Sequence, residues 1–179
     1  MTTVLVLPGY ENSGPEHWQS RWEREHPDHR RVEQRDWSFP LVDDWVSALD
    51  EAVAAEPGEV ALVAHSLGCI TAVRWAVADP ERARDRVRGA LLVAPADVER
   101  LPDLPLGSFA PIPRAALPFR TTVVGSRDDP YMSFDRTEEF AAAWGADLVD
   151  LGDAGHINAD SGLGSWPRGR QLLAALLGA

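Results

Sequence analysis

The sequence predicts an α/β fold, a three-layer αβα sandwich in which helices cover both faces of a mainly parallel six-stranded sheet. Short apolar runs alternate with segments of helical period along the chain, and this alternation is typical of βαβ units. The 179 residues are 45% hydrophobic and 25% charged, the composition of a globular domain with a buried core. We therefore interpret residues 1–179 as a single domain.

Six short segments have the composition or the position expected of strands. The third to fifth are the most apolar, and strands of a parallel sheet that are covered on both faces are apolar along their length. We therefore expect these three near the centre of the sheet. The six segments are Thr3 to Leu7, Arg31 to Gln34, Val60 to Ala64, Ala90 to Ala94, Thr121 to Gly125 and Asp147 to Leu151.

The first helices are predicted from capping and periodicity. An S-x-x-E capping box begins at Ser13 and predicts a helix that extends to about Glu25. The segment from Cys69 to Ala78 has helical character and directly follows the third strand. Between these two helices, an apolar stripe at helical spacing predicts another; it consists of Val42, Trp45, Val46, Leu49 and Val53.

Later in the chain, Asp135 followed by Glu138 predicts a capped helix that Gly145 ends, and the last helix is expected from Pro167. Between the fourth and fifth strands, six prolines fall within the 24 residues 95–118. Because proline opposes regular structure, we expect a surface excursion there. Two interpretations stay open: this segment lines a functional site, or it is a rigid connection without a chemical role.

Composition and charge exclude several function classes. The run from Val4 to Leu7 is too short for a signal peptide, and no apolar stretch approaches the length of a membrane span. The single cysteine, Cys69, leaves no internal disulfide and no Cys/His cluster for a metal, so we expect a cytoplasmic protein without metal or cofactor. The net charge of −11 disfavours nucleic acid and anionic membranes as partners.

The most informative stretch runs from Val60 to Gly68, VALVAHSLG, and continues into a helical segment. This order of strand, sharp turn and helix is that of a nucleophile elbow, which presents Ser66 at the carboxyl end of the strand. The usual G-x-S-x-G motif needs small residues on both sides, and here they are Ala64 and Gly68. The alternative is a serine that only caps a helix, but the context favours a catalytic nucleophile in an α/β-hydrolase fold.

This fold places an acid and then a histidine on loops after later strands. His156 follows the sixth strand, and Gly155 allows a tight loop that aims its imidazole. His65 flanks the nucleophile and is expected to face away from it. Among the five histidines, His156 alone suits the general base.

Three aspartates compete for the role of the triad acid. Asp128 and Asp129 follow the fifth strand, and Asp97 follows the fourth. Asp129 precedes Pro130, which biases its backbone toward an extended conformation and fixes the direction of its carboxylate. We therefore favour Asp129, with Asp128 as the main alternative.

An oxyanion hole is expected from two backbone N–H groups. One is that of Leu67 at the start of the elbow helix, and the other comes from the loop after the first strand. In that loop Gly9 permits close approach and Tyr10 is the candidate donor. The alternative is an ordinary turn that ends the strand.

These residues resemble the small serine hydrolases that include retinoblastoma-binding protein nine and its bacterial relatives. The resemblance spans nearly the whole chain and rests on PGYENSGPEHWQ, DWSFPLVDDW, AHSLGC, GSRDDPYMSF and GHINADSGLGSWPRG. It implies a minimal α/β-hydrolase without a large lid domain, and a triad of Ser66, Asp129 and His156. It also implies activity on small acyl compounds and leaves the natural substrate open.

An acyl pocket is expected near the carboxyl ends of the strands, although tryptophan more often packs in cores. The candidate pocket residues are Gly9, Tyr10, His17, Trp18, Trp37, Met132 and Trp166. The expected partner is a small-molecule acyl substrate, and no protein partner is identified.

Two readings of function remain. The first is a serine hydrolase that cleaves a small ester, thioester or amide through an acyl-enzyme on Ser66. The second is a binding module that keeps the triad but holds a protein or small-molecule partner, because a fold alone does not establish turnover. A nucleotide-binding domain is disfavoured, because neither G-x-G-x-x-G nor a Walker A pattern occurs.

Overall fold

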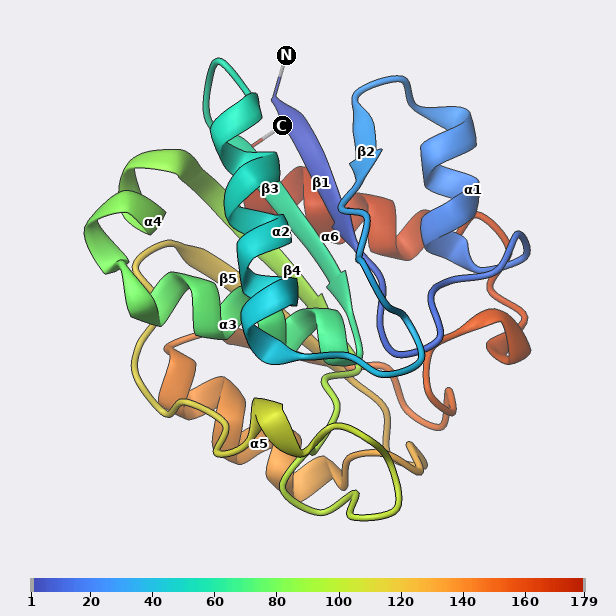
Figure 1. The fold of residues 1–179 in the computed structure, drawn as a ribbon. Helices are drawn as coiled ribbons and strands as arrows, with labels where there is room; N and C mark the ends of the chain where they lie inside the picture. The colour runs from blue at the N-terminus through green and yellow to red at the C-terminus, as the bar shows by residue number, and fades with distance from the viewer. Residues whose placement is uncertain (1, 179) are drawn as a thin grey trace.

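The computed structural model describes residues 2–178 and confirms the three-layer α/β architecture (Figure 1). Six strands form one sheet in the order β2-β1-β3-β4-β5-β6, and each neighbouring pair is parallel. The strands are β1 (Thr3–Leu7), β2 (His29–Arg31), β3 (Val60–His65), β4 (Val87–Val93), β5 (Arg120–Gly125) and β6 (Asp147–Asp150).

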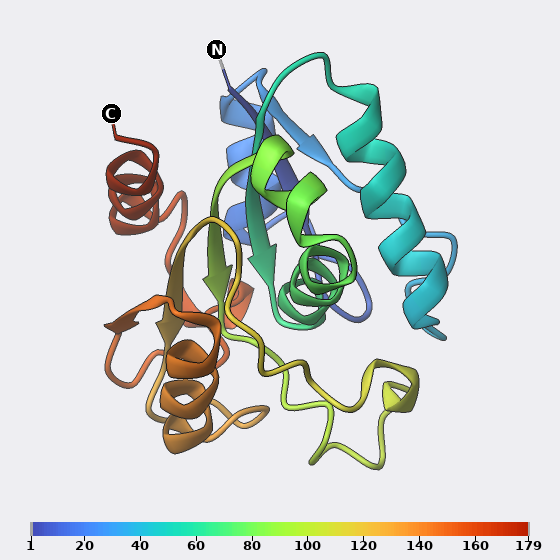
Figure 2. The same cartoon turned by 90° about the vertical axis from the view of Figure 1, so that its left-hand side faces the viewer.

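The helices cover both faces of this sheet (Figures 1 and 2). Residues of α2, α3, α4 and α5 share one apolar core with the sheet, and residues of α1 and α6 pack into the other. The helices are α1 (Trp18–Glu25), α2 (Val42–Ala55), α3 (Leu67–Ala78), α4 (Pro80–Arg86), α5 (Phe134–Trp144) and α6 (Pro167–Leu177), with short 3-10 turns at Gly107–Phe109 and Ala159–Ser161.

The most apolar strands lie at the centre, as their composition predicts. All six residues of β3 are buried, and β4 beside it is buried along most of its length. β5 lies between β4 and the edge strand β6. The two edge strands are short and partly polar, and β2 begins two residues and ends three residues earlier in the chain than expected. Because all neighbouring strands are parallel, their carboxyl ends meet at one edge of the sheet, where the loops after β1, β3, β4, β5 and β6 converge.

The first helix begins later than its sequence signal indicates. Ser13 is not its cap; the side chain of Ser13 is buried, and its hydroxyl donates to Gln19 Oε1 at 2.8 Å. The helix begins at Trp18, and His17 caps it by accepting the Gln19 N–H at Nδ1 over 3.2 Å. Residues 13–16 form a tight connection instead, because burial of the Ser13 side chain competes with local capping.

Two other helix starts differ from expectation. α4 was not expected, although Asp79 caps it and Pro80 occupies its first turn, a signal that is typical of helix starts. The cap of α5 is Ser133 rather than Asp135, which lies in the first turn, where a negative charge interacts favourably with the helix dipole. Gly145 ends α5 in the left-handed conformation, as predicted.

The proline-rich segment 95–118 hangs below the carboxyl ends of the strands (Figures 1 and 2). It is not a purely surface excursion. Leu106, Phe109 and Ile112 are each at most 1% exposed and join the core beside α2 and α3. These buried side chains therefore anchor the segment to the rest of the domain.

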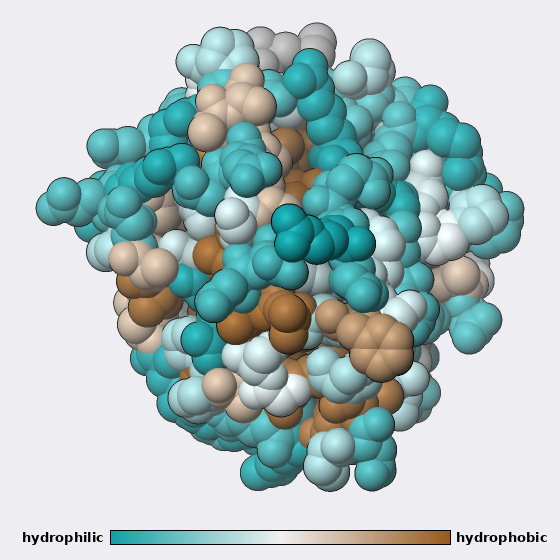
Figure 3. Space-filling view, in the orientation of Figure 1, coloured by the Kyte–Doolittle hydropathy of each residue, from teal (hydrophilic) through white to brown (hydrophobic). Residues whose placement is uncertain are grey.

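Within residues 2–178, no helix combines the length and the apolar character needed to cross a bilayer. Figure 3 shows a mainly hydrophilic surface whose apolar side chains gather on the lower half of the view, at the end where the strands of Figure 1 terminate. Exposed large apolar residues include Phe39, Leu41 and Tyr131.

Candidate active site

Ser66 lies in a strained turn between β3 and α3. Its φ of 56° and ψ of −120° are conformations that a residue with a Cβ rarely adopts. The turn is held because the Ser66 N–H donates to the Val93 carbonyl at 3.0 Å, and the Ser66 carbonyl accepts from Cys69 at 3.0 Å. This is the backbone of a nucleophile elbow, and it projects the Ser66 hydroxyl beyond the sheet.

Small neighbours make this turn possible. A Cβ on Gly68 would lie 2.7 Å from the Pro8 carbonyl oxygen and still closer to that of Leu7, so glycine is required. Ala64 is fully buried in β3; its methyl group is accommodated there, and the departure from the usual glycine does not disturb the elbow.

His156 lies beside Ser66 on the loop after β6. Its Nε2 is 2.9 Å from Ser66 Oγ, and its Nδ1 is 3.0 Å from both carboxylate oxygens of Asp129. A carboxylate accepts the Nδ1 proton, so Nε2 is left free to accept the serine proton. The structure thus brings Ser66, His156 and Asp129 together in the order that a hydroxyl nucleophile requires.

The competing aspartates make other contacts. Asp128 Oδ1 accepts from Ser126 Oγ at 2.8 Å and from the Gly155 N–H at 2.7 Å, and these donors, the Gly155 N–H foremost, lower the pKa of Asp128. Asp128 therefore ties the histidine loop to the loop after β5. Asp97 is buried and binds Arg136 with two contacts of 2.8 and 3.0 Å, which anchors the start of the 95–118 segment to α5.

Two side chains, one from the end of β3 and one from α1, hold the backbone of the histidine loop. His65 Nε2 donates to the His156 carbonyl at 2.8 Å, and Trp18 Nε1 donates to the Ile157 carbonyl at 2.9 Å. His65 therefore does not face away from the site, as the sequence had suggested; its ring centroid is 4.7 Å from that of His156. Burial lowers the pKa of His65 well below the usual value, so this donor is a neutral imidazole.

His17 is packed edge-on against His65 at a centroid distance of 4.7 Å. Because its Nδ1 accepts the Gln19 N–H, Nε2 carries the proton. That Nε2 is buried and finds no acceptor among residues 2–178. Burial first, and then the nearby His156 and Arg31, lower the pKa of His17 to about 3.

The expected oxyanion donors also approach Ser66. A Cβ on Gly9 would lie 2.8 Å from Ser66 Cβ and 3.3 Å from the Leu67 nitrogen, so the loop after β1 passes directly against the elbow. Among the turns, loops and helix caps of residues 2–178, no backbone carbonyl accepts a hydrogen bond from the N–H of Tyr10 or Leu67. Both are available for a negatively charged oxygen.

A cavity of about 380 Å³ opens over Ser66. The expected residues Gly9, Tyr10 and His17 line it, whereas four others do not: Trp18, Trp166 and Met132 are buried in the cores, and Trp37 packs edge-on against Trp45. These apolar side chains contribute more free energy by packing in the interior than by walling an open cavity.

The cavity has residues that sequence reasoning missed. Ala96, Leu101, Leu104 and Leu106 form an apolar wall, all from the proline-rich segment; that segment therefore lines the site, and the interpretation as a connection alone is wrong. The loops after β1 and β6 contribute polar and acidic side chains to the same cavity, namely Glu11, Asn12, Asn158 and Asp160. Leucines spaced between prolines in a long loop were the available signal.

Tyr131 also lines the cavity and was missed. Its ring centroid is 4.5 Å from that of His156, and its N–H donates to Asp129 Oδ1 at 2.9 Å. Its position two residues after the favoured aspartate was the signal that could have identified it.

Comparisons with known proteins identify the family of this chain. The family model described as serine hydrolase matches residues 4–175. The chain belongs to this serine hydrolase family. A protein from Pectobacterium atrosepticum described as a YdeN-like hydrolase is 36% identical, with 99% of this chain and 91% of that chain covered and a TM-score of 0.87. No curated protein sequence matches the chain significantly.

More distant solved structures share the fold with this serine hydrolase. The ydeN gene product from B. subtilis is 21% identical over 100% of both chains, with a TM-score of 0.78. Est1E from Butyrivibrio proteoclasticus, solved with ferulic acid bound, is 11% identical and covers 99% of this chain and 87% of its own, with a TM-score of 0.71. At these identities the likeness concerns the fold alone.

Proposed function

We propose that this serine hydrolase is a carboxylesterase-like enzyme that cleaves a small ester, thioester or amide through an acyl-enzyme on Ser66. One observation carries the proposal: the Ser66 hydroxyl, the His156 imidazole and the Asp129 carboxylate are in hydrogen-bond contact, and Ser66 and His156 line a cavity of about 380 Å³. A binding module has no need of a strained, activated serine there.

The chemistry begins at Ser66. Its Oγ attacks the substrate carbonyl carbon while its proton passes to His156 Nε2, and Asp129 stabilises the imidazolium that forms. The carbonyl oxygen becomes an oxyanion facing the Leu67 and Tyr10 N–H groups. When the bond to the leaving group breaks, the His156 proton passes to that group.

Hydrolysis of the acyl-enzyme repeats the sequence with water. His156 accepts a proton from the water molecule as its oxygen bonds to the acyl carbon, and the proton returns to Ser66 Oγ when the ester bond breaks. The products are a carboxylic acid and the enzyme in its starting form. Every proton transfer uses His156, and the chain needs no redox partner.

Labelling tests the proposal. A fluorophosphonate should add one adduct to the intact protein, and Ser66→Ala should abolish it. Cys69 carries the single thiol of the sequence; it is buried, and burial raises the pKa of this thiol. Cys69→Ala therefore serves as the matched control and should still be labelled. An adduct that persists in Ser66→Ala would contradict the proposal.

Turnover separates the enzyme from the binding module. We expect Ser66-dependent hydrolysis within a panel of short-chain esters, thioesters and amides that share one acyl group. Labelling of Ser66 without hydrolysis of any member of the panel would favour the alternative function, in which the intact triad holds a partner.

A further inference from the structure

The residues that line the cavity differ in chemistry. The 95–118 segment supplies the leucine wall, whereas two carboxylates that also line the cavity, those of Glu11 and Asp160, come from the loops after β1 and β6. Among the residues that the structure describes, no Lys or Arg side chain lines the cavity. An adjoining hollow shares Tyr131, His156, Asn158 and Asp160 with the cavity and adds a further carboxylate, that of Asp153.

Neither carboxylate of the cavity is neutralised by the protein. Within residues 2–178, Glu11 and Asp160 take part in none of the ion pairs. The Arg31 guanidinium instead forms an ion pair with Glu23 Oε1 at 2.9 Å and donates to Asn12 Oδ1 at 2.9 Å. The negative charge of these two lining residues is therefore available to a ligand in the cavity.

Glu11 is held at the cavity. Its φ of 63° is unusual for a residue with a side chain, and its N–H donates to the Trp37 carbonyl at 3.0 Å. Its carboxylate accepts from the Ser38 hydroxyl at 3.0 Å. The strained backbone and the contact with Ser38 thus hold the Glu11 carboxylate in one position, whereas an exposed glutamate without such contacts would be mobile.

Two aromatic rings line the same cavity as these carboxylates. Tyr10 and Tyr131 line the same cavity, and Tyr131 is 39% exposed and packs against His156. The face of an aromatic ring attracts cations, and carboxylates with aromatic rings together recognise alkylammonium groups. This is an observation independent of the acidic residues, and it indicates the same kind of ligand.

The mechanism decides which part of the substrate meets these residues. His156 Nε2 must reach the leaving group to protonate it, so the leaving group lies beside the histidine loop. Asn158 and Asp160 lie on that loop, and Tyr131 packs on His156. The acyl group is then directed to the leucine wall.

We propose that the enzyme selects acyl substrates whose alcohol or amine portion carries an alkylammonium group over neutral isosteres, and that it disfavours anionic leaving groups. This inference rests on the proposed function and specifies its substrate class. The carboxylates of Glu11 and Asp160 and the rings of Tyr10 and Tyr131 stabilise the cation, while the leucine wall accepts the acyl chain.

Matched esters test the selection. Butyrylcholine and 3,3-dimethylbutyl butyrate differ in one charged atom, and the butyrate ester of 2-hydroxyethanesulfonate is the anionic member. We expect kcat/KM to be about tenfold higher for the cationic ester than for its neutral isostere, the size of one or two partly solvated charge contacts. Salt should reduce the ratio, because the screening length falls from ~10 Å at about 0.1 M to ~3 Å at about 1 M.

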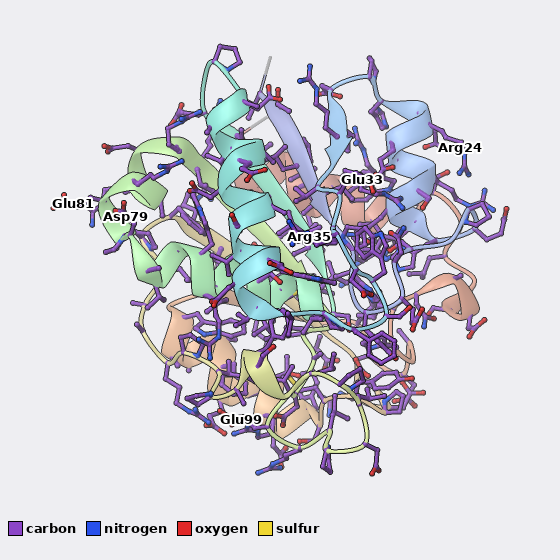
Figure 4. All side chains as sticks on the ribbon, viewed as in Figure 1. Arg24, Glu33, Arg35, Asp79, Glu81 and Glu99 are labelled. Atoms are coloured by element: carbon purple, nitrogen blue, oxygen red, sulfur yellow. The ribbon has the colours of Figure 1, made fainter. Side chains whose placement is uncertain are left out.

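Variants locate the effect. Glu11→Gln and Asp160→Asn should each lower the cationic-to-neutral ratio by about threefold. Glu81→Gln is the matched control, because it removes one exposed carboxylate on α4 that projects away from the loops after β1 and β6 (Figure 4). An equal loss in Glu81→Gln would overturn the local assignment, and a ratio of one in the unmodified enzyme would overturn the proposal.

A second measurement needs no turnover. Choline should slow fluorophosphonate labelling of Ser66 at lower concentration than 3,3-dimethylbutanol does. Equal protection by both alcohols would overturn the cation preference while labelling itself still supports the nucleophile. Absence of Ser66 labelling would instead contradict the proposed function, so the two failures are distinguishable.

Discussion

The loops that carry Ser66 and His156 both have strained backbones, but they are held in different ways. Ser66 has a φ of 56° and follows the central strand β3, where the carbonyls of Leu7 and Pro8 leave no space for a side chain at Gly68. Ile157, next to His156, has a φ of 49°, but its loop follows the edge strand β6 and is partly exposed.

Side chains from other elements hold the histidine loop. Trp18 from α1, His65 from the end of β3, and Ser126 and Asp128 from the loop after β5 all hydrogen-bond to its backbone. The position of the nucleophile is therefore a property of the close-packed core, whereas the position of the base depends on distributed polar contacts. Substitutions should act differently on the two regions.

The largest expected effect distinguishes Asp128 from Asp129, the two adjacent aspartates that contact the histidine loop from the loop after β5. Asp129→Asn should leave the fold intact and lower the acylation rate by up to about 10⁴-fold, because the amide can hold the wrong imidazole tautomer. Asp128→Asn should cost about tenfold or less, because its amide oxygen can still accept from Gly155. Single-turnover acylation with one activated ester, with circular dichroism as a folding check, measures both. If Asp128→Asn lost most of its acylation rate while Asp129→Asn kept it, Asp128 rather than Asp129 would be the triad acid.

A substitution at the nucleophile elbow should lower stability, because it disturbs close packing. Gly68→Ala places a methyl group against the Leu7 and Pro8 carbonyls, and such overpacking costs about 1–3 kcal/mol of unfolding free energy or more. For a domain of this size that lowers Tm by roughly 2–4 °C per kcal/mol. Gly58→Ala is the matched control, because among residues 2–178 no atom beyond the two flanking residues lies within 4 Å of a Cβ there. Equal thermal shifts in the two variants would show that the elbow is not close-packed.

The histidine loop should instead lose activity when a polar support is removed. Trp18→Phe leaves the Ile157 carbonyl without its donor, a loss of about 1–3 kcal/mol for a buried group. We expect kcat for an ester to fall more than KM rises, because the imidazole rather than the cavity is displaced. Trp22→Phe, which removes a comparable indole donor to the Ser165 carbonyl away from the triad, should change stability without this kinetic signature. Matching kinetics in the two variants would contradict the positioning role.

The smallest expected effect concerns pH. The pKa of His17 is about 3 in the folded chain against 6.5 for an unperturbed histidine, so between these values the unfolded chain binds the additional proton. Stability is then lost as pH falls below about 6.5, and from about pH 7 to about pH 5 the loss due to His17 is roughly 2 kcal/mol. His17→Gln should remove that portion in denaturant titrations at the two pH values. An unchanged pH dependence in the variant would show that His17 is protonated in the fold.

Much of this was predictable because the signals are local. The strand, elbow and helix around Ser66 are contiguous in sequence, and Gly68 is required by contacts that every such turn makes. The order of the strands' carboxyl ends then restricted the base to His156 and the acid to the loops after β4 and β5. The start of α1 was missed because Ser13 is buried against Gln19, a contact that local capping rules do not include.

The sequence by itself determined the parallel sheet, the elbow and the identity of the residues that meet there, because periodicity and close-packing rules act over short stretches of chain. Only the tertiary structure decided what surrounds them. Trp18 and His65 became supports of the histidine loop, the proline-rich segment became the leucine wall, and Glu11 and Asp160 came to share one cavity. These contacts join residues far apart in the chain, and their geometry depends on how the loops pack at the end of the sheet.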